Sequence, residues 1–99
     1  MTVDELLEST QSDVIPPAGL SAELQSLWHT KVGNWDDAHN IAQEIHTPFG
    51  SAIHAHLHVI EGDLGNAGYW YRKAGRPTRG PETLDEEWRE LVEEAIGMN

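Results

Sequence analysis

The sequence contains no cysteine. This absence excludes a disulfide framework, a thiolate-bound zinc site and a cysteine nucleophile. No run of about eighteen apolar residues is present either, and the first residues, MTVDELLEST, are acidic and lack the basic and apolar segments of a signal peptide. We therefore expect a cytoplasmic protein that neither spans a membrane nor is secreted.

Basic residues are scarce. Only 6 of the 99 residues are Lys or Arg, against 17 Asp or Glu, which gives a formal charge of -11. Such a charge repels polyanions, so we expect neither a nucleic acid nor a membrane as partner. Four of the six basic residues form a basic segment between the acidic ends of the chain: Arg72, Lys73, Arg76 and Arg79. Intramolecular charge pairing is the simpler explanation of this segment, and anion binding is the alternative.

Recognisable enzyme motifs are also missing. The sequence has no G-x-S-x-G turn, no Walker loop and no dinucleotide-binding fingerprint. A chain of 99 residues is the size of one domain and has little room to enclose a ligand cavity without forming an oligomer. We therefore expect a binding protein in preference to an enzyme, a homo-oligomer such as a homodimer, and no organic cofactor.

What the chain does have is an internal repeat. Four Trp and 38% hydrophobic residues indicate a folded domain. A shift of 29 residues superimposes identical residues at four places. These pairs are His29 with His58, Gly33 with Gly62, Ala38 with Ala67, and Pro48 with Pro77. Each copy reads as a helix, a glycine-containing turn and a second helix. Residues 21–48 and 49–79 are therefore predicted to form two tandem helical hairpins.

The flanking segments complete a single all-α domain over residues 1–99. Residues 83–97 have a helical apolar stripe and begin with Thr83, which is predicted to form a capping box with Glu86. We expect this segment to be a C-terminal capping helix that covers the open end of the repeat pair. Residues 1–19 form an N-terminal arm that is expected to dock on the other side.

The hairpins resemble tetratricopeptide repeats, in which small residues on paired helices allow close approach. Ser26 with Ala38, and Ala55 with Ala67, match that pattern over residues 21–79. The resemblance implies a right-handed array of hairpins, although the period of 29 residues is shorter than the family's period of about 34. The segment HAHLHVIEGDLGNAGYWYRKAGRP also resembles a family of small helical proteins with an HxxxHxxEGDxxNAxYWYRxAGxP core. That second resemblance implies a family identity and does not indicate a function.

Six histidines supply candidate metal ligands. His54 and His58 are four residues apart on one predicted helix and share a face with Glu61. Two imidazoles and a carboxylate in this arrangement can bind one divalent cation if a second helix adds a ligand. His29 and His39 are the candidates for that ligand.

A purely structural role is the competing interpretation. His29 and His58 occupy the same position in the two repeats, whereas a metal site needs ligands that converge at one point. His56 falls on the apolar side of its helix and is predicted to be a packed or interface histidine.

An aromatic and basic face is the second candidate site. Tyr69, Trp70, Arg72, Lys73 and Arg76 follow one another along the second helix of the second hairpin and just beyond it. This combination of cations and aromatic rings can bind an anion, a phosphorylated ligand or an acidic peptide.

Three functions remain open from the sequence. The leading hypothesis is a helical-repeat interaction or scaffold module that self-associates or binds a protein partner. The second is a metal-binding protein or metal-dependent enzyme that uses the histidines. The third is anion binding at the basic segment.

Overall fold

The computed structural model describes residues 1–98, and within them the chain is all-α, as predicted. Six α-helices and one short 3₁₀ helix make up the fold, and no strand occurs in these residues. The elements are α1 (Val3–Ser12), α2 (Ala22–Val32), α3 (Trp35–Gln43), α4 (Pro48–Glu61), α5 (Leu64–Ala74), η1 (Pro81–Thr83) and α6 (Leu84–Gly97).

The two hairpins are α2 with α3 and α4 with α5. Gly33 and Gly62 end the first helix of each hairpin with φ values of 90° and 86°, a left-handed conformation that favours glycine. In the first hairpin the small side chains approach closely, because Ser26 Oγ donates a hydrogen bond of 2.8 Å to the Ala38 carbonyl. The turn glycines of the repeat therefore mark the structural boundaries.

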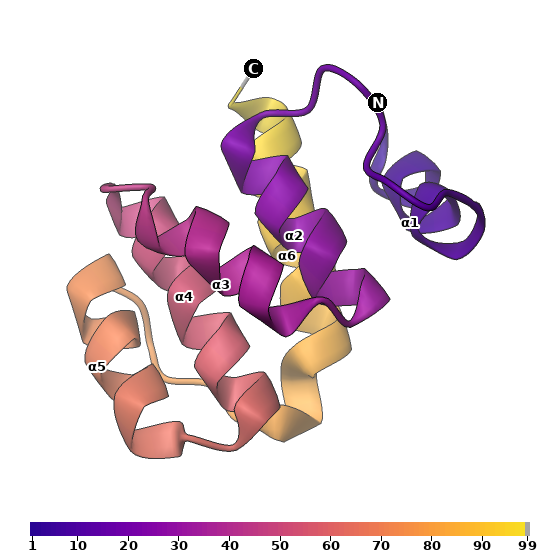
Figure 1. The fold of residues 1–99 in the computed structure, drawn as a ribbon. Helices are drawn as coiled ribbons and strands as arrows, with labels where there is room; N and C mark the ends of the chain where they lie inside the picture. The colour runs from indigo at the N-terminus through magenta and orange to yellow at the C-terminus, as the bar shows by residue number, and fades with distance from the viewer. Residues whose placement is uncertain (99) are drawn as a thin grey trace.

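The hairpins stack through α3 and α4, and α6 lies across α2 and α4 (Figure 1). Trp88 of α6 is buried, and its Nε1 donates a 2.8 Å hydrogen bond to the Leu27 carbonyl. The last helix thus contacts the first helix of both hairpins. The predicted capping box at Thr83 is wrong, because this residue ends the 3₁₀ turn and its side chain caps no helix nitrogen.

The N-terminal arm contains a helix that docks on α2 and α6. Leu6 is fully buried, and the Trp28 indole donates a 3.1 Å hydrogen bond to Ser9 Oγ. The loop that follows α1 leaves Val14 and Ile15 largely exposed, at 94% and 72%. The arm therefore buries one side of its helix and presents an apolar loop to solvent.

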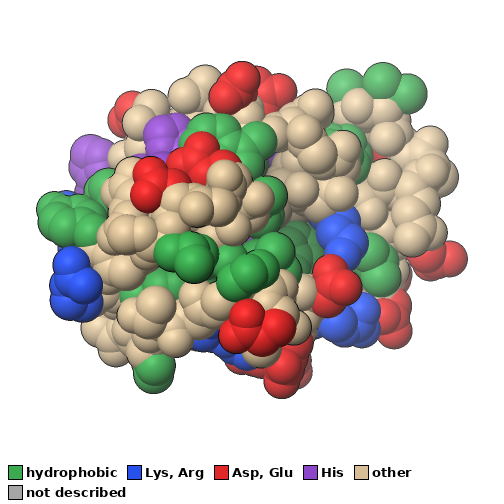
Figure 2. All heavy atoms as spheres, turned by 90° about the horizontal axis from the view of Figure 1, so that it is seen from below, with side chains coloured by type: hydrophobic (Ala, Val, Ile, Leu, Met, Phe, Trp, Pro, Cys, Tyr) green, Lys and Arg blue, Asp and Glu red, His purple; other side chains and the backbone are tan. Residues whose placement is uncertain are grey.

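Helix α5 forms one edge of the domain and packs chiefly against α4. Leu64 and Ile60, which the periodicity places on apolar stripes, are consequently half exposed at the turn between α4 and α5. This turn lies at the bottom of Figure 1, and the view from below in Figure 2 shows hydrophobic side chains gathered between acidic ones. None of the helices within residues 1–98 combines the length and apolar character needed to cross a bilayer.

Candidate metal centre

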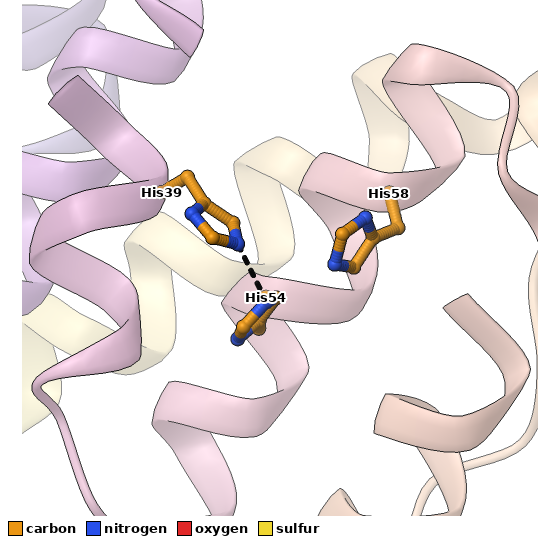
Figure 3. Close-up of side chains that lie close together, drawn as sticks. All are labelled: His39, His54 and His58. Atoms are coloured by element: carbon orange, nitrogen blue, oxygen red, sulfur yellow. Dashed lines mark hydrogen bonds between the residues drawn. The ribbon is translucent and has the colours of Figure 1, made fainter. Parts of the chain in front are cut away.

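Three imidazoles converge between α3 and α4. His39 lies on α3, and His54 and His58 lie one turn apart on α4 (Figure 3). One ring nitrogen from each lies within 4.8 Å of those of the other two. His54 and His58 are buried and His39 is partly buried. The fold therefore gathers three potential nitrogen ligands from two helices at one point.

His39 and His54 share a hydrogen bond. Their Nε2 atoms are 2.8 Å apart, so one of these atoms carries a proton that it donates to the other. In a tetrahedral zinc site with bonds of about 2.0 to 2.1 Å, neighbouring ligand nitrogens lie roughly 3.3 Å apart. The two nitrogens therefore lie slightly closer together than two neighbouring ligands of one zinc ion would.

Two tryptophans hold the imidazole rings in place. Trp35, one turn before His39 on α3, stacks on its ring with a centroid distance of 4.8 Å and an angle of 11°. Trp70 of α5 stacks on His54 at 3.9 Å and 12°. The Trp35 indole also donates a 2.7 Å hydrogen bond to the Leu57 carbonyl, which ties α3 to α4. These contacts restrict the rings to orientations that face one another.

Glu61 orients the third imidazole. Its carboxylate accepts a hydrogen bond of 2.5 Å from His58 Nδ1. A proton held on Nδ1 leaves Nε2 of the same ring with a lone pair for a metal ion. Carboxylate–histidine pairs of this kind commonly support metal-binding histidines.

The environment favours the neutral form of His54 and His39. Burial first, and then the nearby His39, His58 and Lys73, lower the pKa of His54 from 6.5 to about 4. Burial and His58 also lower the pKa of His39, against the opposing effect of Glu61 and Asp36. Neutral imidazole is the form that binds a metal ion.

These lowered pKa values make the stability of the metal-free protein dependent on pH. Between pH 6.5 and about 4, unfolded His54 is protonated while folded His54 is not, so the unfolded state binds more protons. We expect the free energy of unfolding to decrease by up to about 3 kcal/mol as the pH is lowered from 6.5 to about 4. Urea titrations at several pH values measure the fall.

His54→Gln should flatten this pH dependence, whereas His46→Gln should preserve it because His46 is exposed. An equally steep dependence in His54→Gln would contradict the assignment to this imidazole.

The other predicted ligands have different positions. Glu61 contacts the cluster through His58, and with Asp63 these two residues form a second, largely exposed group of potential ligands. His29 belongs to neither group; its ring meets the edge of Trp28 and lies 3.5 Å from the Asn34 amide. The two histidines that the repeat superimposes therefore have different surroundings.

The basic segment is divided between two faces. Arg76 forms a bidentate ion pair with Glu94, and Arg79 pairs with Glu90, so both side chains are directed at α6. Intramolecular pairing therefore accounts for these two cations. Arg72 is exposed.

The remaining residues of the aromatic and basic face form a cluster on α5. Lys73 Nζ lies 4.9 Å from the centre of the Trp70 ring and 6.0 Å from that of Tyr69. Neither Lys73 nor Arg72 forms an ion pair with a carboxylate within residues 1–98. These two are the cations of the basic segment that α6 leaves unneutralised.

A groove of about 460 Å³ borders the imidazole cluster. Its lining includes His54, Trp70 and Lys73, together with residues of the first turn of α4 and of the loop before it. The volume is within the range of small-molecule sites. His54 is thus shared between the imidazole cluster and the groove.

A second polar cluster was missed by the sequence reasoning. Glu87 of α6 is buried and accepts 2.8 Å hydrogen bonds from the Tyr71 hydroxyl and a 2.7 Å bond from His56 Nδ1. Burial and the bond to Glu87 raise the pKa of Tyr71. The signal in the sequence is a carboxylate on an apolar stripe, since Glu87 lies between Leu84 and Leu91 at helical spacing. The predicted packing of His56 is confirmed by its burial.

Comparison of the chain with protein-family models, with curated proteins and with solved structures finds no match in any of the three. The resemblance to tetratricopeptide repeats stays a prediction, and the site has to be interpreted from its own geometry.

Proposed function

We propose that the protein binds a divalent transition metal, with Zn²⁺ as the principal candidate, through His39, His54 and His58. The observation that carries this proposal is the convergence of three ring nitrogens from two helices within 4.8 Å. It revises the ranking drawn from the sequence, in which a metal site came second to an interaction module.

The donor set favours this class of metal. Three neutral imidazoles suit Zn²⁺, Cu²⁺ or Ni²⁺, whereas Mg²⁺ and Ca²⁺ prefer oxygen ligands. Three protein ligands also leave one position of a tetrahedral zinc ion for an exchangeable ligand. Glu61, which accepts the hydrogen bond of His58, supplies the outer support that such sites use.

Metal titration tests the proposal. We expect one equivalent of Zn²⁺ to bind per chain in isothermal titration calorimetry. Co²⁺, which reports its coordination through visible absorption, should give intense bands typical of a tetrahedral site. Less than a tenth of an equivalent of bound metal after gel filtration in a chelator-free buffer would refute it.

Removing the support of His58 should weaken the site without abolishing it. We expect Glu61→Gln to lower the affinity for Zn²⁺ by about ten- to a hundredfold, because the orientation and basicity of the imidazole both depend on the carboxylate. Competition with a fluorescent zinc chelator measures this loss. Glu44→Gln, at an exposed glutamate of similar charge, is the control and should change the affinity less than twofold. Equal affinities of the two variants for Zn²⁺ would show that Glu61 does not support the metal site.

Self-association is a second proposed function, and the exposed apolar loop favours it. Val14 and Ile15 are 94% and 72% exposed, and Pro16 and Pro17 directly follow them. Two consecutive prolines restrict the loop and reduce the entropy lost when it binds. This loop fits an interface with a second copy of the chain in a homodimer, or with a cytoplasmic protein partner of a tetratricopeptide-like module.

Light scattering tests the proposed homodimer. The double substitution Val14→Ser/Ile15→Ser should convert a dimer into a monomer, and a monomeric parent protein would rule the homodimer out.

A further inference from the structure

The proposed metal site lies beside a groove whose charge differs from that of the rest of the protein. The lining of the groove contains Lys73 and no Asp or Glu, although the whole chain has 17 acids and a formal charge of -11. Its other polar lining groups are amide, hydroxyl and imidazole side chains: Gln43, His46, Thr47, Ser51 and His54. A groove lined by an ammonium and no carboxylate repels an anion less than the acidic surface of the rest of the protein does.

We infer that this groove binds a small oxyanion, a carboxylate or a phosphate, as the exchangeable ligand of the metal held by His39, His54 and His58. This inference rests on the proposed metal site and names the class of ligand that completes it. It combines two hypotheses that the sequence left separate, a histidine metal site and anion binding at the basic segment.

Lys73 is placed to pair with such an anion. Its ammonium group lies over the Trp70 ring, and the Trp70 ring stacks on His54. All three side chains line the groove, and His54 also belongs to the imidazole cluster. Because no carboxylate within residues 1–98 pairs with Lys73, an incoming anion displaces no existing ion pair.

The lining of the groove also includes a helix N-terminus. Helix α4 begins at Pro48, and Gly50 and Ser51 of its first turn line the groove. The helix dipole favours negative charge at this end. The groove thus brings an ammonium group and the first turn of a helix together beside His54, one of the three proposed metal ligands.

The Co²⁺-loaded protein provides the test, with acetate and inorganic phosphate as probes. We expect each effective anion to shift the visible bands saturably while cobalt remains bound after gel filtration. Lys73→Met should raise the dissociation constant of the anion about fivefold, the size expected for one partly exposed ion pair. A response to acetate alone identifies a carboxylate ligand, and a response to phosphate alone identifies a phosphate ligand.

Lys31→Met is the matched control. Lys31 Nζ also lies 4.9 Å from a Trp ring, that of Trp88, but it does not line this groove. Its removal makes the same change in net charge and should alter the dissociation constant less than twofold. Equal effects of the two substitutions, no spectral response to either anion, or loss of the cobalt on anion addition would each overturn the inference. Failure of the protein to take up Co²⁺ at all would instead refute the metal site, before any anion is added.

Discussion

Replacing His58 with Ala should lower the affinity for Zn²⁺ at least about a hundredfold, because it removes one of three ligands and leaves Glu61 without the imidazole that it orients. Loss of an outer supporting group alone costs about ten- to a hundredfold, so loss of a ligand should cost more. Isothermal titration calorimetry or chelator competition measures the change. Circular dichroism of the metal-free variant should still show a helical protein.

The repeat supplies an unusually close control for this experiment. His29 occupies the position of His58 in the first hairpin, yet it lies outside both groups of potential ligands. His29→Ala should therefore leave the affinity for Zn²⁺ within about twofold of that of the parent protein, because only imidazoles that converge on one point can bind the same ion. Equal losses in the two variants, or full affinity in His58→Ala, would show that the three-histidine cluster is not the site.

Replacing Glu87 with Ala should reduce the free energy of unfolding by about 3 to 5 kcal/mol. The carboxylate is 5% exposed and accepts hydrogen bonds from Tyr71 and His56, so its loss strands two buried polar groups and leaves a cavity. Urea denaturation followed by circular dichroism measures the difference. A variant that is already unfolded without urea would agree with a loss of this size.

The neighbouring Glu86 controls for the general effect of removing a negative charge from α6. Its side chain is 68% exposed and makes a long contact of 3.8 Å with Arg79, so Glu86→Ala should change stability by less than about 0.5 kcal/mol. Glu87→Gln keeps the shape and an acceptor for the Tyr71 hydroxyl, and it should be less damaging than Glu87→Ala. A loss below about 1 kcal/mol in Glu87→Ala would show that water or a rearranged partner satisfies His56 and Tyr71.

Most of the helical architecture was predictable because its signals are local. Gly33 and Gly62 end helices through a backbone conformation that few other residues adopt, and the spacing of apolar residues predicts which face of each helix is buried. The wrong prediction at Thr83 has a local cause too: the last helix does begin at Leu84, directly after Thr83, but the 3₁₀ turn from Pro81 gives Thr83 a ψ of 18° and its hydroxyl donates to the Gly80 carbonyl. The path of α6 across both hairpins depends on long-range packing of Trp88 and was not predictable from its own segment.

The sequence by itself determined that the chain is helical, that it repeats after 29 residues and that His54 and His58 share a helix face, because periodicity and turn chemistry act over a few residues. Only the tertiary structure decided which distant groups meet. Stacking α3 on α4 brings His39 to His54 and leaves His29 apart, although the repeat makes His29 and His58 equivalent. Packing α6 against the hairpins neutralises Arg76 and Arg79 and leaves Lys73 unpaired within residues 1–98. The reason is that a functional site requires convergence in space, which the order of residues along one helix does not contain.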